Sequence, residues 1–326
     1  MRFNTAKLIG AEVIRPVDRE IVCAFHDIDG THSFIRNWPP VMSRVLYDAS
    51  VNGLLPGAES EENIKRLTDL CDTEPIEETD RFCVESAGLS ALTQMEWALR
   101  KHEEITGGRF AGENNREIIE RIWNGRERWE DISEPEEYTS RLAAETPVLF
   151  RVYEKVLNRF CRDKNLAEAR KDPDKYLVAG SKEFMRFLHD RGVKNYFITG
   201  AVVDKSIEPP SGMYEEVLAL GFEIGPGLEV EDIIGSTWEE KIPKDEVMYR
   251  LLDELGLSAE NVLVVGDGRS EISAGVDMGA ATLSRLPENA VRQRELHRSL
   301  GTNVIVRDYI GLCEQLAGIT PDKAGL

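Results

Sequence analysis

Acidic residues follow two short apolar stretches of the sequence, and their side chains could carry phosphoryl-transfer chemistry. Asp27 and Asp29 follow the stretch 21–25. One carboxylate can attack phosphorus to form an aspartyl-phosphate, and the other can protonate the leaving oxygen and then activate water. Like charges this close oppose joint ionisation, so we expect a bound Mg²⁺, which prefers oxygen ligands. The alternative is an Asp-rich turn that caps a helix.

Asp267 and Glu271 form a second acidic pair, four residues apart, after the apolar stretch 262–265. Their spacing at an expected strand-to-helix junction suits one direct and one water-mediated metal contact. Taken alone, the pair is also explained as a turn followed by negative charge in the first turn of a helix.

A hydroxyl and a cation complete the set of candidate groups. Thr199 and Gly200 follow the stretch 196–198, where a hydroxyl and a backbone N–H could bind a phosphate oxygen. A plain helix N-cap is the alternative for this pair. Lys241 or Lys244 could offset the charge of Asp27 and of a transferring phosphate, although most single lysines are simply solvated.

The elements around these residues alternate between strands and helices. Continuous apolar stretches such as 21–25 and 262–265 are typical of strands buried on both faces of a parallel sheet. Further strands are expected at 193–198, 230–234 and 304–306, and helices at 181–191, 213–220 and 244–255. This alternation predicts an α/β fold with a doubly wound, Rossmann-like parallel sheet. In such sheets the site lies beyond the carboxyl ends of the strands, where we expect Asp27, Thr199 and Asp267.

The middle of the chain has helical periodicity instead. Apolar residues recur on one helical face between 89 and 102, and similar spacing occurs at 114–123 and 135–160. Gly107 and Gly108 separate the first two of these helices. We therefore predict an all-helical cap domain at 35–172, inserted into a catalytic core formed by 1–34 and 173–326.

Composition excludes several classes of partner. The 326 residues carry a net charge of −19, which argues against nucleic acid. No apolar run is long enough to span a bilayer, and the first residues lack the order of a signal peptide. Five scattered cysteines without a C-x-x-C pair suggest reduced thiols, so we expect a cytoplasmic protein.

The order of the motifs resembles that of the haloacid dehalogenase superfamily. These motifs are Asp-x-Asp-Gly-Thr at 27–31, a strand ending in Thr-Gly at 199–200, a lysine, and Gly-Asp-x-x-x-Glu at 266–271. Each motif is weak alone, but the ordered set of four is specific.

The resemblance implies a role for each residue. Asp27 matches the family's nucleophile and metal ligand, and Asp29 matches its general acid/base, with its backbone carbonyl on the metal. Thr199 matches the phosphate-binding hydroxyl. Asp267 matches a metal ligand, and Glu271 matches the second acid of that motif, where Asp is commoner.

Two lysines fit the remaining position. Lys244 lies 23 residues before Asp267, a spacing that resembles the phosphoserine-phosphatase branch. Lys241, followed by Pro243, resembles the Lys-x-x-Pro form of other branches, but is one residue out of step. We favour Lys244.

The acid at position 29 also implies the reaction. The dehalogenase branch has no acid there, so the resemblance indicates a Mg²⁺-dependent phosphatase that uses an aspartyl-phosphate. A phosphomutase and a non-catalytic phosphate-binding or signalling protein are the alternatives. A helical cap over the site favours a small phosphorylated metabolite as the substrate, since a macromolecule could not be enclosed.

Overall fold

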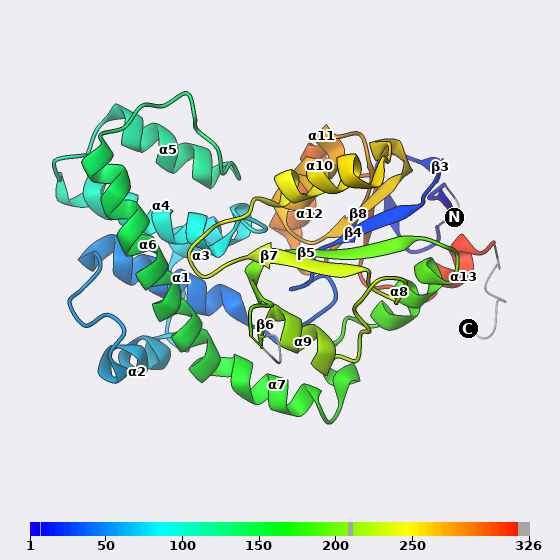
Figure 1. Ribbon diagram of the computed structural model, residues 1–326, viewed down its shortest axis with the longest axis horizontal. Coiled ribbons are helices and arrows are strands. Elements are labelled where there is room, and N and C mark those ends of the chain that lie inside the picture. Colours follow the sequence, from blue (N-terminus) through cyan, green and yellow to red (C-terminus); the bar gives the residue numbers. More distant parts are fainter. Residues whose placement is uncertain (7, 208–210, 319–326) are drawn as a thin grey trace.

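The computed structural model describes residues 1–6, 8–207 and 211–318, and an eight-stranded sheet lies at its centre (Figure 1). Six neighbouring strands are parallel, in the order β10–β9–β8–β4–β5–β7. They are β10 (Val304–Val306), β9 (Ala281–Arg285), β8 (Val262–Gly266), β4 (Cys23–His26), β5 (Lys194–Asp204) and β7 (Asp232–Ser236). Two short strands pair antiparallel with this set, β2 (Glu12–Val13) with β10 and β6 (Ser211–Gly212) with β5. A separate antiparallel pair joins β1 (Arg2–Asn4) to β3 (Asp18–Glu20).

Helices cover both faces of the sheet, as Figure 1 shows. On one face lie α10 (Lys244–Leu255), α11 (Arg269–Asp277) and α12 (Val291–Leu300), and on the other lie α8 (Ser181–His189) and α9 (Met213–Ala219). The short α13 (Leu312–Leu316) packs against α8. All four residues of β4 are buried, with Phe25 packing toward α10 and Ala24 toward α8. Burial on both faces explains why this strand has no polar alternation.

The register of the central strands brings their carboxyl ends together. His26 of β4 is paired with Phe197 of β5 and with Val265 of β8. The ladder continues one step further, because the backbone N–H of Asp27 donates to the carbonyl of Val265 at 2.9 Å. Residues that follow β4 and β8 therefore leave the sheet side by side.

The rest of the chain forms a helical part with its own apolar core, at the left of Figure 1. Its helices are α1 (Trp38–Asn52), α2 (Glu61–Leu70), α3 (Glu77–Glu85), α4 (Ala91–Thr106), α5 (Glu113–Trp123) and α6 (Glu136–Leu157). Ser90 caps α4 by accepting the N–H of Thr93, and Gly107, with a φ of 64°, ends it in the left-handed conformation. Buried Phe82 and Trp97 stack at the centre of this core.

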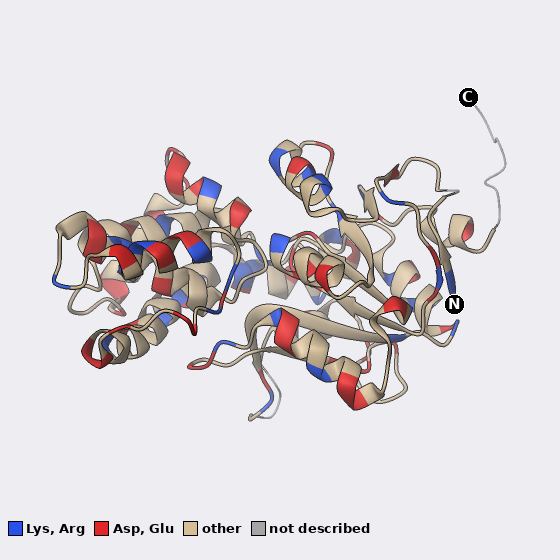
Figure 2. Ribbon diagram, turned by 90° about the horizontal axis from the view of Figure 1, so that it is seen from above, with Lys and Arg blue, Asp and Glu red and all other residues tan. Residues whose placement is uncertain are grey.

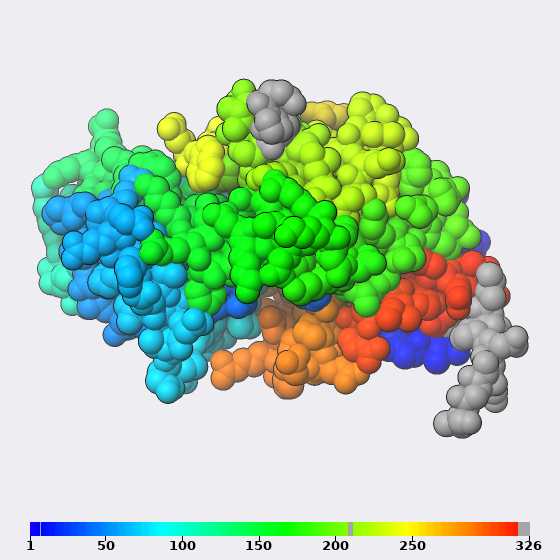
Figure 3. Space-filling view, turned by 90° about the horizontal axis from the view of Figure 1, so that it is seen from below, coloured from blue at the N-terminus to red at the C-terminus, as the bar shows by residue number. Residues whose placement is uncertain are grey.

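A single helical run returns from this part to the sheet. After α6 the chain continues through a π-helical turn, η1 (Asn158–Arg162), into α7 (Asp163–Ala169). Leu166 and Ala169 of α7 pack in the core of the α/β part rather than in that of the helical part. In Figure 3 this green run spans the face from one part to the other. A short 3₁₀ helix, η2 (Pro173–Tyr176), follows it, and another, η3 (Ala259–Asn261), precedes β8.

The structure confirms the α/β fold class, the parallel sheet and the helices of the middle segment. The division into domains at 34/35 and 172/173 stays a prediction, and residues 7, 208–210 and 319–326 of the expected core lie outside the described residues. One expectation was wrong: β5 does not end at Ile198 but runs to Asp204, past a register irregularity between Ile198 and Val202. Acidic residues occur on helices of both parts, interspersed with Lys and Arg (Figure 2).

Among the described residues, no helix is both long enough and apolar enough to cross a membrane.

Candidate active site

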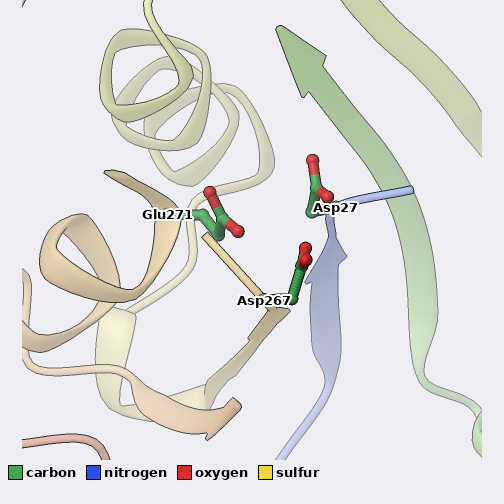
Figure 4. A group of neighbouring side chains, drawn as sticks. All are labelled: Asp27, Asp267 and Glu271. Atoms are coloured by element: carbon green, nitrogen blue, oxygen red, sulfur yellow. The ribbon is translucent and has the colours of Figure 1, made fainter. Parts of the chain in front are cut away.

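Three carboxylates from three elements converge at the carboxyl edge of the sheet. Asp27 follows β4, Asp267 follows β8, and Glu271 lies in the first turn of α11. One oxygen of each lies within 4.8 Å of one oxygen of each of the others, and Figure 4 shows the side chains pointing toward one another. Three acids at this separation repel one another unless a proton or a cation compensates their charge.

Lys244 supplies part of that compensation. It is the first residue of α10, and its Nζ lies 2.5 Å from Oδ1 of Asp27 and 3.0 Å from Oε2 of Glu271. Burial alone would lower the pKa of Lys244, but the two facing carboxylates raise it above its usual value, so the amine stays charged. The other candidate, Lys241, lies elsewhere: its Nζ is 3.5 Å from Glu96 and 4.5 Å from the ring centre of Trp129.

Burial raises the pKa values of Asp27, Asp29 and Asp267. Burial raises the pKa of Asp27 to about 6, against the opposing effect of Lys244. Burial, together with the charges of Asp27 and Glu271, raises the pKa of Asp267 well above its ordinary value. Burial also raises the pKa of Asp29, although Arg36 opposes it, and its Oδ1 is buried without a hydrogen-bond partner among the described residues. A carboxyl group in this state can hold a proton and donate it.

Thr31 connects two of the acids. Its hydroxyl lies 3.0 Å from Oδ1 of Asp267 and 3.3 Å from Oδ2 of Asp27. The side chain is fully buried. Thr31 is the last residue of the Asp-x-Asp-Gly-Thr motif. No role was predicted for it, and its position in that motif was the available signal.

Thr199 and Gly200 line the same cavity as Asp27, but from within β5 rather than from beyond its end. The physical reason is that Val202 and Val203 continue the strand after the irregularity. The Thr199 hydroxyl accepts the backbone N–H of Ala201 at 3.1 Å, which leaves its own proton free to donate. No helix N-cap is present at this position.

A buried chain of hydrogen bonds holds both ends of the loop that carries Asp27. Ser181 Oγ lies 2.7 Å from His32 Nδ1, His32 Nε2 lies 3.1 Å from His26 Nδ1, and His26 Nε2 lies 3.3 Å from Oδ1 of Asn195. The amide nitrogen of Asn195 donates to two backbone carbonyls, so its oxygen must accept from His26. Burial lowers the pKa of His26 to about 3 and that of His32 well below its usual value, so both rings are neutral. Each ring therefore has one donor and one acceptor, and the chain runs in one direction from Ser181 to Asn195.

The helical part forms the far wall of the cavity, which has a volume of about 590 Å³ including its opening to solvent. Trp38, Gln94, Tyr153 and Glu154 line it from α1, α4 and α6. These residues were not predicted as part of the site, because nothing in helical periodicity distinguishes a cavity wall from a core. Arg109, on the loop between α4 and α5, is exposed and paired with Glu137, away from the residues that line the cavity.

The loop between α3 and α4 contacts the α/β part beside the acids. The backbone N–H of Ser270 donates to the carbonyl of Ala87 at 3.2 Å. A Cβ on Gly200 would lie 2.7 Å from the carbonyl oxygen of Leu89, and one on Gly88 would lie 2.3 Å from Oε2 of Glu271. Glycines at these positions allow the loop to approach this closely.

A buried charge network joins the two connections between the parts. Arg36, just before α1, donates through Nε and Nη2 to Glu216 of α9 at 2.9–3.1 Å and through Nη1 to Glu154 of α6 at 3.1 Å. Arg162, at the end of η1, donates to the same Glu216 at 2.7 Å. Both carboxylates and both guanidinium groups are thereby paired.

The donor set at the acids fits a hard divalent cation. Carboxylate oxygens are the ligands that Mg²⁺ prefers. Burial and repulsion from the other acids raise the pKa of Asp267, and a bound cation would oppose both effects. Both oxygens of Glu271 already accept hydrogen bonds, from Lys244 at 3.0 Å and from the N–H of Gly268 at 2.6 Å. Oδ2 of Asp267 accepts no hydrogen bond from a described residue, and Oδ2 of Asp27 competes with Asp267 for the single proton of Thr31. Asp27 and Asp267 are therefore the better placed direct ligands, and Glu271 is better placed as an outer-sphere ligand.

The fold and the acidic site define the class of protein, and the comparisons agree. The model of the haloacid dehalogenase-like hydrolases matches residues 57–279, which is more than half of the chain. This chain is therefore a haloacid dehalogenase-like hydrolase. The matched range includes Thr199, Lys244, Asp267 and Glu271 and begins after Asp27, whose position in the site is given by the structure.

Several solved structures are similar to this one, and no curated protein matches the sequence. A hydrolase from Pseudomonas syringae is 14% identical, with 92% of this chain and 99% of that chain covered and a TM-score of 0.45. A phosphonoacetaldehyde hydrolase-like protein from Oleispira antarctica is 13% identical, with 96% of each chain covered and a TM-score of 0.47. A β-phosphoglucomutase from Clostridium difficile is 11% identical, with 92% and 100% covered and a TM-score of 0.44. Similarity at this level does not identify a substrate.

Proposed function

We propose that this chain is a Mg²⁺-dependent phosphatase that hydrolyses a small phosphorylated metabolite through an aspartyl-phosphate on Asp27. The observation that carries the proposal is the buried contact of Asp27 with Lys244, beside Asp267 and Glu271. The carboxylate of Asp27 can act as the nucleophile. Lys244 and a Mg²⁺ bound by the neighbouring acids would offset the charge of the phosphoryl group that it attacks.

In the first half of the reaction, Asp27 attacks phosphorus and Asp29 gives its proton to the departing alcohol oxygen. The raised pKa of Asp29 favours the protonated form that this step needs. The hydroxyl of Thr199 and the N–H of Gly200 donate to phosphoryl oxygens, and Lys244 offsets their charge. The P–O bond to the alcohol breaks as the bond to Asp27 forms.

In the second half, Asp29 is a carboxylate and takes a proton from water. The water oxygen attacks phosphorus, the acyl-phosphate bond breaks, and Asp27 regains its carboxylate as inorganic phosphate leaves. Asp27, Asp267 and the backbone carbonyl of Asp29 would hold Mg²⁺ directly, and Glu271 would act as an outer-sphere ligand. When bound, the ion would supply positive charge to the phosphoryl oxygens.

The helical part acts as a cap in this proposal. Its side chains form one wall of the cavity, and its α3–α4 loop lies beside the acids. A cap of this kind excludes bulk water during the first half-reaction and contacts the leaving group. A site walled by both parts of the chain favours a small metabolite over a phosphoprotein.

The test is hydrolysis of p-nitrophenyl phosphate and of a panel of phosphorylated metabolites, with and without Mg²⁺. Asp27→Asn should abolish Mg²⁺-dependent phosphate release while its circular dichroism spectrum stays as in the wild type. Asp69→Asn, a matched change on the exposed face of α2, should keep full activity. A wild-type protein that releases no phosphate from any of these esters, or an Asp27→Asn variant with full activity, would overturn the proposal.

A further inference from the structure

Among the described residues that line the cavity, no basic side chain is free to pair with a second anionic group. Of the described residues that line it, Arg36 and Lys244 are the basic ones, and both are buried and ion-paired. Lys244 faces the acids that act on the phosphate. Arg36 interacts with the charge of Asp29, the acid proposed to protonate the leaving group, and is held by the carboxylates of Glu154 and Glu216. We call this side of the cavity the leaving-group end.

The positive charges at the leaving-group end are already paired. Arg36 pairs with Glu154 and Glu216, and Arg162 pairs with Glu216, Glu215 and Asp163, so the positive charges of both arginines are matched by carboxylates. The side chains of Arg36 and Glu216 are 3% and 0% exposed, so rearranging them would uncover a buried charge. A carboxylate or second phosphate on the leaving group would be desolvated here without a counter-charge, which is costly.

Hydrogen-bond acceptors, by contrast, are available. Glu154 uses Oε1 to accept from Arg36, and its Oε2 makes no hydrogen bond to any described residue. An amide N–H of Gln94 donates to Ser86 Oγ at 2.9 Å. The amide oxygen of Gln94 has no partner in the described part of the chain. Both residues line the cavity. A leaving group with O–H or N–H donors would satisfy both acceptors.

Part of the cavity wall is apolar. Trp38, Met42 and Leu89 line the same cavity as the two acceptors. They suit a short hydrocarbon segment between the phosphate ester and the donors.

We infer that the substrate is a small phosphomonoester whose alcohol carries hydroxyl or ammonium donors and no negative charge, with Glu154 and Gln94 as the residues that select it. This inference rests on the proposed phosphatase function. Glu154 and Gln94 would discriminate between esters of neutral or cationic alcohols and esters of carboxylate-bearing alcohols. The motif residues contact the phosphate and do not make this distinction.

Three two-carbon phosphomonoesters that differ only in their terminal group provide the test: 2-hydroxyethyl phosphate, O-phosphoethanolamine and phosphoglycolate. We expect kcat/KM for the hydroxyl and ammonium esters to exceed that for phosphoglycolate by at least about tenfold. Hydrolysis of phosphoglycolate at an equal or higher kcat/KM would overturn the inference while the phosphatase function stands. Failure to hydrolyse any of the three, or p-nitrophenyl phosphate, would overturn the phosphatase function and the inference with it.

Glu154→Gln tests the named residue within one enzyme. It removes the acceptor charge and releases one side of Arg36, while Glu216 still pairs the guanidinium group. The ratio of kcat/KM for phosphoglycolate to that for O-phosphoethanolamine should rise at least about tenfold. Glu137→Gln, an exposed change on the same helix α6, should leave this ratio as in the wild type. An unchanged ratio in Glu154→Gln would contradict the assignment.

Gln94→Leu gives a second measurement that does not disturb the ion pairs. It should lower kcat/KM for the hydroxyl and ammonium esters by about fivefold or more, because their donors lose an acceptor. The value for phosphoglycolate should change by less. An equal loss for all three esters would indicate a general packing defect and would count against selection by Gln94.

Discussion

Nζ of Lys244 lies 2.5 Å from Oδ1 of Asp27, although the two residues are 217 positions apart in the sequence. The contact joins the start of α10 to the end of β4 in a buried setting. It gives the nucleophile proposed here a permanent cation that does not depend on a bound metal.

Replacement of this cation should therefore impair catalysis. In Lys244→Met we expect kcat for p-nitrophenyl phosphate to fall by about 10²–10³-fold, because the charge that offsets the transferring phosphoryl group is lost. Lys241→Met is the matched control, since Lys241 contacts Glu96 and Trp129 instead. Full activity in Lys244→Met, or an equal loss in both variants, would show that the contact has no catalytic role.

Mg²⁺ should stabilise the folded protein through the acidic cluster. A ligand that binds only the folded state adds about 2.7 kcal/mol at a concentration of 100 times its Kd, so the Tm should rise as MgCl₂ is titrated. Asp267→Asn should abolish this rise, because a carboxylate of the cluster is lost. Asp253→Asn, exposed on α10, should show the same rise as the wild type. A rise that persists in Asp267→Asn would place the binding of Mg²⁺ elsewhere.

A methyl group at Gly200 should push the α3–α4 loop away from the site. Its Cβ would lie 2.7 Å from the carbonyl oxygen of Leu89, closer than any relaxed contact. We expect Gly200→Ala to cost about 1–3 kcal/mol of unfolding free energy and to lower kcat/KM. Gly112→Ala is the control, because its φ of −179° suits any residue and its Cβ would meet nothing within 4 Å. Equal behaviour of the two variants in denaturant unfolding and kinetics would contradict the close contact.

Buried His297 should make the protein less stable below neutral pH. Burial lowers the pKa of His297 to about 4 in the folded state, against an ordinary value of 6.5. Between these values the unfolded chain binds more protons, so unfolding becomes easier as the pH falls. His297 alone should cost about 1 kcal/mol of unfolding free energy between pH 6.5 and pH 5.5.

His297→Asn removes the titrating ring and can keep the hydrogen bond to Ser284, which is 2.8 Å long in the wild type. The pH-dependent loss of unfolding free energy, measured by urea titration at both pH values, should be smaller in this variant by about that amount. His189→Asn, at the half-buried end of α8, should leave the loss unchanged. The same loss in His297→Asn as in the wild type would mean that this ring does not carry the effect.

The sequence predicted the parallel sheet because its central strands are short apolar stretches that end in Asp27 and Asp267. Local patterns of this kind can be read without knowing the tertiary contacts. The extent of β5 was missed because Gly200 interrupts the apolar pattern, although the strand continues to Asp204. Local reading could not find the site residues of the helical part either. Glu154 lines the cavity and accepts a hydrogen bond from Arg36, which lies 118 positions away in the sequence, and no local pattern records such a contact.

The two connections between the helical part and the sheet lie side by side. The side-chain amide of Asn165 in α7 donates to the carbonyl of Ile35 at 2.8 Å. The segment that leaves the α/β part therefore contacts the segment that returns to it. A segment whose two ends contact each other can be gained, lost or exchanged during evolution without a change in strand order, because only a short connection is needed to join the rest of the chain. The residues proposed for phosphoryl transfer and the wall proposed to select the alcohol can thus diverge at separate rates.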